Sequence, residues 1–271
     1  MKVYHYTNLE ALKGILSGRK GLLCFWGTRY DSMNDPTDCI FAKEHVLPNA
    51  KRALLKYGYN ENELEDIETH PYIVSFSQAE DSFFMWRTYK AEIAIELNYD
   101  VIKAEVDKLI DGKVHSGLYC GMCKYPKDEQ EIHQVFIELF NQAEQTVNNL
   151  MDTVREQLPL IKYSGFEDEQ EIRLFKFDYD LATFNGETGE SIEGEIPEGI
   201  NVKCIRNNDF VFYKKFFLPI DALSGIILNC HDKKHYDKIK NHVELFLKMQ
   251  DITRSIEIRQ SQTGKFINPN I

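Results

Sequence analysis

The sequence lacks a long hydrophobic run and lacks a surplus of positive charge. No apolar segment approaches the ~20 residues that a membrane-spanning helix needs, so we expect no membrane partner. The chain has 32 lysines and arginines against 43 aspartates and glutamates, a formal net charge of −11. Because that charge repels phosphate backbones, general nucleic-acid binding is not expected either. A nucleotide small molecule remains compatible with it, since one arginine and a few backbone N–H groups can hold a phosphate.

The sequence also lacks the features of an exported protein. Its first residues, Met1 to His5, contain neither an apolar core nor a small-residue cleavage site. Without an export signal, the six cysteines are expected to be buried thiols, and the protein is expected to be cytoplasmic. Cys120 and Cys123 have no second such pair at a suitable spacing, so no metal site is expected.

Common catalytic signatures are missing as well: the Walker loop, GxGxxG, GxSxG and HExxH do not occur. What is present is the composition of an ordinary folded protein, with 43% hydrophobic and 28% charged residues in 271. No internal repeat or evident linker divides the chain. The sequence therefore predicts one domain over 1–271, with a helical insertion around 128–164.

Hydrophobic periodicity indicates a mixture of strands and helices. Predicted strands cover 2–6, 20–26, 71–77, 91–97, 114–125, 171–177, 201–206, 210–217, 224–229 and 254–260. Predicted helices cover 9–16, 36–47, 99–111, 128–158 and 233–249. Because strands and helices do not alternate regularly as βαβ units, the pattern favours an α+β fold over a doubly wound sheet.

Several residues indicate where helices begin and end. Thr7 and Glu10 have the spacing of a capping box for the first helix. Asp35 is suited to cap a helix that has Pro36 at its first position. Pro48 is expected to break that helix.

His5 is the first candidate functional residue. Strand alternation directs His5 to one face and Tyr4 and Tyr6 to the other, so only one set is expected to face the core. A single strand histidine is more often a structural hydrogen-bond partner than a reactive group. Both readings stay open on the sequence alone.

The aromatic segment from Ser82 to Tyr89 follows a strand that carries Ser75 and Ser77 on one face. Trp86 and Tyr89 in this turn-like stretch suit a stacking wall for a planar ring, with Arg87 free to hold phosphate. A hydrophobic plug under a loop fits the same residues equally well.

Glu169, Glu171 and Arg173 are predicted to share one face of a late strand. Two carboxylates held this close repel each other, so one is expected to bind a proton readily or to need a cationic partner. Exposed ladders of this kind are common, but here the strand turns apolar immediately afterwards, which indicates a sheet rim where sites often lie.

Taken in order, these segments resemble the bacterial domain of unknown function 2971 (DUF2971). The segments are Tyr4-His5-Tyr6-Thr7, the helix Leu9–Leu16, Asn34-Asp35-Pro36, Ser75-Phe76-Ser77, Met85-Trp86-Arg87-Thr88-Tyr89, Glu169-Gln170-Glu171-Ile172-Arg173-Leu174 and Ile226-Ile227-Leu228. One difference is local: family members usually have a Gly-containing turn after the Trp-x-x-Tyr segment, and here Lys90 and Ala91 stand in its place.

The order also has a more distant resemblance to the ADP-ribosyltransferases, with His on the first strand, Ser or Tyr on a middle strand and Glu on a late strand. That resemblance implies mixed and antiparallel sheets that form a central cleft holding a bent NAD. His5 would then bond the cofactor ribose, Glu171 would bond the 2′-hydroxyl of the nicotinamide ribose, and Glu169 would orient the acceptor. The further cofactor contacts that it implies are Tyr6, Thr7, Ser75, Ser77, Trp86, Arg87, Tyr89 and Arg173.

The resemblance thus implies a nucleotide-handling enzyme, most concretely an NAD-dependent ADP-ribosyltransferase, a kind of glycosyltransferase, whose acceptor is open. A fixed carboxylate suits this chemistry because cleavage of the N-glycosidic bond develops positive charge on the ribose. A non-catalytic nucleotide- or partner-binding module with the same cleft is the first alternative. An RNA-end phosphotransferase is the second, although the charge of −11 disfavours it.

Overall fold

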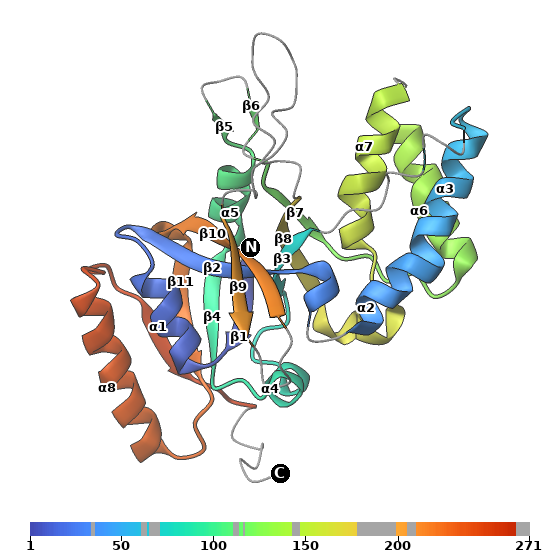
Figure 1. Cartoon of the computed structure of the whole chain (residues 1–271). Coiled ribbons are helices and arrows are strands. Elements are labelled where there is room, and N and C mark those ends of the chain that lie inside the picture. The colour runs from blue at the N-terminus through green and yellow to red at the C-terminus, as the bar shows by residue number, and fades with distance from the viewer. Residues whose placement is uncertain are drawn as a thin grey trace.

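The computed structural model describes residues 1–33, 36–60, 64, 71–110, 114–115, 117–142, 147–177, 199–204 and 210–263. In these residues a large, mostly antiparallel sheet is flanked by helices (Figure 1), which confirms the predicted α+β class. None of the described helices has the length and apolar character required to cross a membrane.

Most predicted elements are present, with shifted ends. The strands are β1 (Lys2–Thr7), β2 (Leu22–Arg29), β3 (Tyr72–Ser77), β4 (Ile93–Asn98), β5 (Leu109–Ile110), β6 (Val114–His115), β7 (Tyr119–Met122), β8 (Glu171–Lys176), β9 (Ile200–Cys204), β10 (Phe210–Pro219), β11 (Leu223–Leu228) and β12 (Glu257–Gln260). The α-helices are α1 (Leu9–Ser17), α2 (Pro36–Phe41), α3 (Leu47–Lys56), α4 (Phe83–Tyr89), α5 (Tyr99–Val106), α6 (Glu129–Gln142), α7 (Val147–Gln157) and α8 (Lys233–Met249). A π-helical turn, η2 (Ala42–Val46), and the 3₁₀ turns η1 (Tyr30–Ser32), η4 (Leu158–Leu160), η5 (Ser164–Glu169) and η7 (Ile220–Ala222) complete the order.

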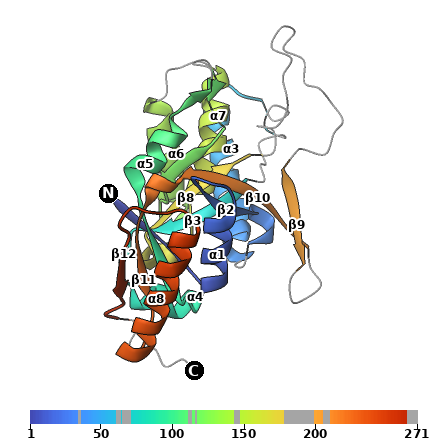
Figure 2. The same ribbon diagram turned by 90° about the vertical axis from the view of Figure 1, so that its left-hand side faces the viewer.

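The main sheet has the order β12-β11-β4-β1-β3-β2-β10-β9, so β9 and β12 lie at its opposite ends (Figure 2). It divides at β3. One edge of β3 pairs with β8 along its whole length, whereas the other edge pairs with β2 only at its start and with β1 only at Ser77. Strands β1 and β2 therefore diverge over the middle of β3, and this split positions the candidate site.

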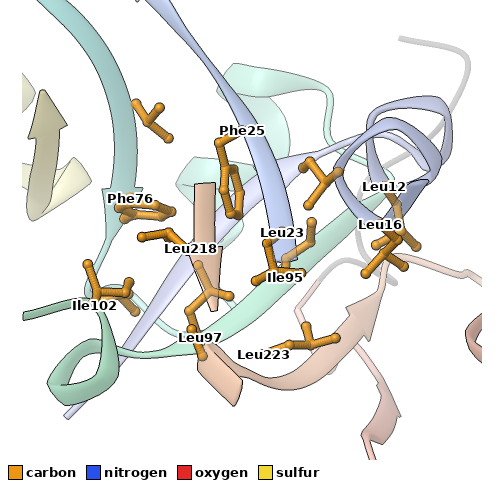
Figure 3. Packing of buried hydrophobic residues seen from close by; sticks show 14 of the residues in the cluster. Leu12, Leu16, Leu23, Phe25, Phe76, Ile95, Leu97, Ile102, Leu218 and Leu223 are labelled. Carbon is orange, nitrogen blue, oxygen red and sulfur yellow. The ribbon is translucent and has the colours of Figure 1, made fainter. Parts of the chain in front are cut away.

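The main core fills one face of the sheet beneath α1, α5 and α8. Figure 3 shows its interior, where Leu12 and Leu16 of α1 and Ile102 of α5 pack against side chains of β2, β3, β4, β10 and β11. Burying each such side chain contributes about 1.5–3 kcal/mol. This layer is large enough to hold the strands rigidly on either side of the split.

Both faces of β1 are packed, contrary to the prediction that only one would be. Val3 lies in the main core, and the His5 ring packs against Phe25 and Phe76 of that core. Tyr4 and Tyr6 are buried on the opposite face in a second cluster beneath α4. The reason is that α4 covers the second face of β1.

A separate helical cluster lies beside the sheet, where α3, α6 and α7 stand together (Figure 1). The prediction of one continuous helix over 128–158 is wrong. Phe136 of α6 and Val154 of α7 both pack in this cluster, although 18 positions of one straight helix would separate them by about 27 Å. Residues 143–146, between the two helices, lie outside the described part of the chain.

Three local predictions need correction. The first helix is capped by Asn8, whose side chain accepts a hydrogen bond from the N–H of Ala11 at 2.8 Å, because Thr7 still belongs to β1. Pro48 does not end its helix; it occupies the first turn of α3, which continues directly from the π-helical turn. The segment predicted as turn-like is the helix α4, which Ser82 caps. Asp35, the other predicted cap, lies outside the described residues.

Candidate functional site

The split between β1 and β2 opens into a cavity of about 560 Å³, within the ~300–1,000 Å³ range of small-molecule pockets. Its wall combines β1, β2, β3, α4, η5 and the start of β8. Of the predicted site residues, the wall includes His5, Tyr6, Thr7, Ser75, Ser77, Tyr89, Glu169 and Glu171. It does not include Trp86, Arg87 or Arg173.

His5 bridges the split. Its Nδ1 lies 2.9 Å from the carbonyl oxygen of Ser75. On this edge of β3, neither β1 nor β2 pairs with Ser75, because the two strands diverge there. A carbonyl only accepts, so Nδ1 carries the proton and donates it. Burial lowers the pKa of His5 and outweighs the opposing effect of the Ser75 carbonyl, so the ring is neutral at pH 7 with Nε2 as an acceptor.

The two serines of β3 have different surroundings. Ser77 is buried, and its hydroxyl donates to the Glu169 carbonyl at 2.6 Å and accepts from the N–H of Ala79 at 3.0 Å. Ser75 is half-buried and lies opposite Arg173 in the register of β3 and β8. Ser77 therefore holds the backbone that carries Glu169.

Glu169 and Glu171 both face the cavity, but not through strand alternation. Glu169 ends η5, and β8 begins only at Glu171. Between them Gln170 takes a left-handed conformation, with φ 45°, and its carbonyl accepts from the N–H of Gln78 at 3.0 Å. A left-handed residue turns the chain sharply. This corner directs the two carboxylates to the same side.

A buried ion network holds both carboxylates. The Nζ of Lys162 lies 2.7 Å from an oxygen of Glu169 and 2.7 Å from an oxygen of Glu171. Arg173 bonds Glu171 through Nε at 3.0 Å and Nη2 at 3.1 Å, and its Nη1 donates to the Pro159 carbonyl at 2.6 Å. Arg173 thus lies behind Glu171 as a support, not on the wall as a cofactor contact.

This network decides the ionisation of Glu171. Burial by itself raises a carboxyl pKa, but Arg173 and Lys162 outweigh it and lower the pKa of Glu171 to about 2. The N–H of Glu171 also donates to the Tyr125 hydroxyl at 2.7 Å, which fixes the start of β8. Glu171 is therefore a rigid carboxylate that is ionised at neutral pH.

Helix α4 presents one side to the cavity. Met85, Thr88 and Tyr89 are spaced three and four residues apart and line the wall together. Burial and the neighbouring Glu169 raise the pKa of Tyr89, which keeps its hydroxyl protonated. The turn after α4 is closed by Lys90 with φ 47°, a conformation that glycine adopts more readily.

Trp86 does not form the predicted stacking wall. It lies about a quarter of a helical turn from Met85 and faces the sheet, fully buried against Tyr6 at a ring distance of 4.7 Å. Its Nε1 donates to Asp81 at 2.8 Å. Arg87 points outward and is exposed. Tyr89 is thus the aromatic side chain that α4 contributes to the wall.

Lys162 is the site residue that the sequence analysis missed. It lies between η4 and η5, where its N–H donates to the carbonyl of Lys124 at 2.9 Å. No motif marks it, because its position depends on this pairing between distant segments. The one available signal was the segment Pro159 to Ile161, an apolar stretch that would bury a lysine placed next to it.

Comparisons with known proteins found one family model and one solved structure that are similar to this chain. Residues 85–174 match the model of the family described as "Protein of unknown function (DUF2971)". Over its whole length the chain is similar to the solved structure of Thermus sp. 2.9 DarT in complex with NAD+, with 12% sequence identity, a TM-score of 0.33, and coverage of 98% of this chain and 97% of that one. No curated protein matches the sequence. The predicted resemblance to DUF2971 is thereby confirmed over residues 85–174, the part of the chain that carries Tyr89, Lys162, Glu169, Glu171 and Arg173.

Proposed function

We propose that this cavity binds a nucleotide and transfers ADP-ribose from NAD to an acceptor. The observation that carries the proposal is the meeting of His5, Tyr89, Glu169 and Glu171 on the wall of one cavity, although they come from β1, α4, η5 and β8. Each of these residues taken separately is as well explained by packing. A neutral imidazole, an aromatic ring and a fixed carboxylate with a second one beside it are the groups that this reaction uses.

Glu171 is the residue we assign to the chemistry. Breaking the bond between nicotinamide and ribose develops positive charge on the ribose, and a fixed carboxylate stabilises that charge. Glu171 suits the role because its pKa of about 2 keeps it ionised at pH 7. Within the described part of the chain, its Oε1 accepts one hydrogen bond, from Arg173 Nε, and a carboxylate oxygen has a second lone pair to offer a ribose hydroxyl.

The charge on the wall suits one end of NAD better than the other. Glu169 and Glu171 face the cavity with Lys162, the one lysine or arginine among the described residues of the wall. A cationic nicotinamide ring beside Tyr89 and the carboxylates fits this surface. The diphosphate requires cations outside this part of the wall. Of the predicted residues, Arg87 on the exposed side of α4 is the one suited to bind it.

Release of nicotinamide from NAD tests the proposal. Wild-type protein should release it, and Glu171→Gln should reduce the rate about 10²–10³-fold, as is typical when a group that stabilises transition-state charge is lost. Equal rates in the two proteins would remove Glu171 from the chemistry, and no release by the wild type with a panel of acceptors would contradict the transferase.

Glu96→Gln is the matched control. Glu96 is a buried carboxylate of the same sheet, bonded to Lys2, Ser224 and Arg259, and it does not line the cavity. Its replacement should leave the rate of nicotinamide release unchanged. If both variants lost activity equally, the loss would reflect damage to the sheet.

One observation favours the alternative of a non-catalytic binding module. The four charges of Lys162, Glu169, Glu171 and Arg173 balance one another, so the network is complete without turnover. On this alternative NAD or ADP-ribose raises the melting temperature and is not consumed. The absence of any thermal shift over a broad nucleotide panel would contradict it.

A further inference from the structure

We propose that Lys162 is a positioning residue of this site: its ammonium group joins the Glu169 and Glu171 carboxylates and holds both in place at the cavity wall. The structural part of this inference concerns the carboxylates alone. The part that concerns turnover rests on the proposed function.

The backbone of Lys162 is held by a pairing with Lys124. Ile161 pairs with Lys124 in a parallel bridge, and the N–H of Lys162 donates to the Lys124 carbonyl at 2.9 Å. The side chain is buried, and Nζ lies 4.6 Å above the ring of Phe166. A lysine with this little freedom holds its ammonium group at one place, unlike the flexible surface lysines of weak ion pairs.

The two carboxylates depend on Lys162 to different degrees. Glu171 has the two-pronged bond from Arg173 in addition to Lys162. For Glu169, Lys162 is the one cation within salt-bridge distance among the residues that the structure describes. Loss of the ammonium group would therefore leave Glu169 as a buried carboxylate without a counter-charge.

The surroundings decide what Glu169 would then do. Among the described residues, the titratable and charged groups that face Lys162 and Glu169 include Glu171 and Arg173 from β8, Tyr89 from α4 and Tyr125 from the segment after β7. Glu171 would repel the charge on Glu169, both tyrosines are neutral, and Arg173 is already engaged with Glu171. A buried charge that has lost its partner is strongly destabilising, so the Glu169 side chain would not keep its place beside Glu171. Lys162 thus acts on the site through Glu169.

Lys162→Met tests this because methionine has a similar length without the charge. In ¹³C spectra of glutamate carboxyl groups, the resonance that Glu171→Gln identifies should shift its titration to higher pH in Lys162→Met, because Lys162 helps to lower the pKa of Glu171, and Lys162→Arg should restore the wild-type behaviour. An unchanged titration in Lys162→Met would overturn the proposal. This measurement needs no substrate, so it remains decisive even if the protein releases no nicotinamide.

Turnover gives the second readout. If the wild type releases nicotinamide, the rate of release by Lys162→Met should be about 10²-fold lower at pH 7. The acidic limb of its pH–rate profile should move to higher pH, whereas that of Lys162→Arg should stay where it is in the wild type. Lys214→Met is the matched control, because Lys214 is equally buried and does not line the cavity. A profile of Lys162→Met that coincides with the wild type would overturn the part concerning turnover.

A folding defect in Lys162→Met would not leave the question open. The double variant Lys162→Met with Glu169→Gln removes one positive and one negative charge, so the remaining pair of Glu171 and Arg173 stays balanced. Its melting temperature should exceed that of Lys162→Met. If the double variant were no more stable than the single one, Lys162 would not act through Glu169.

Discussion

Two buried carboxylates of the same sheet, Glu96 and Glu171, have closely related positions and very different surroundings. In the sheet register, Glu96 pairs with Tyr4, Tyr4 with Ser77, and Ser77 with Glu171. These four residues form one row across β4, β1, β3 and β8. Each carboxylate binds two cations. The row thus provides a natural comparison within one molecule.

The difference lies in the cations and in the cavity. The side chains of Lys2 and Arg259, which bind Glu96, are 53% and 25% exposed, so water screens those ion pairs. Those of Lys162 and Arg173, which bind Glu171, are 7% and 0% exposed. Of the two carboxylates, Glu171 lies on the cavity wall beside a second carboxylate, Glu169, and Glu96 does not line that cavity. Buried charge is therefore common to Glu96 and Glu171, whereas the adjoining cavity and the second carboxylate, Glu169, distinguish Glu171.

The largest expected effect is a difference in stability between replacing Arg173, which binds Glu171, and replacing Arg259, which binds Glu96. Arg173→Met leaves Glu171 buried with Lys162 alone and leaves the Pro159 carbonyl without this donor, so the free energy of unfolding should fall by about 3–5 kcal/mol. Arg259→Met should cost only about 1 kcal/mol, because solvent screens the pair and Lys2 remains. Urea unfolding measures both. Equal losses would mean that the two networks do not differ in burial as the structure indicates.

A smaller effect concerns acid. The folded-state pKa of Glu171 is about 2, below its ordinary value of 4.5, so its ionised form stabilises the fold above about pH 4.5 and loses that contribution as the pH falls toward 2. The difference in unfolding free energy between the wild type and Glu171→Gln should therefore shrink by roughly 3 kcal/mol over this range.

Urea unfolding between pH 6 and pH 3.5 measures the upper part of this change, with Glu96→Gln as the comparison. Lys2, Arg259 and Ser224 outweigh burial and lower the pKa of Glu96 too, so its contribution has the same sign. Because its cations are more exposed, the contribution should be smaller. A constant difference between the wild type and Glu171→Gln would contradict the network around Glu171.

Parts of this comparison were accessible from the sequence. Strand alternation correctly placed Glu171 and Arg173 on one face, and the order of the segments indicated that the first and late strands belong together. Alternation gave the right face for Glu169 for the wrong reason, since the left-handed Gln170 directs it. Local pattern cannot show a corner of this kind, because a non-glycine residue in that conformation has no sequence signature.

Other parts depended on tertiary contacts. Lys162 is held by a backbone hydrogen bond to Lys124, 38 positions earlier in the chain, and no local pattern reports such a pairing. The apolar stripe continues from α6 into α7 because both helices bury it against the same cluster, so periodicity alone predicted a single helix. Trp86 was misplaced because helical spacing leaves it beside Tyr89, three residues on, and only the docking of α4 on the sheet decides that Trp86 is the one turned inward.

The smallest expected effect compares the two serines that support these carboxylates. The Ser77 hydroxyl donates to the Glu169 backbone and accepts from Ala79, whereas the Ser224 hydroxyl donates to the Glu96 side chain at 2.9 Å. Ser77→Ala leaves two buried backbone groups without this partner and should cost about 2 kcal/mol; Ser224→Ala should cost about 1 kcal/mol, since Lys2 and Arg259 remain on Glu96. Urea unfolding compares the two values, and nicotinamide release separates them further, because Ser77→Ala shifts the backbone of Glu169 while Ser224→Ala acts outside the cavity. A larger loss of both stability and activity in Ser224→Ala would reverse the assignment of the site to the β8 end of the row.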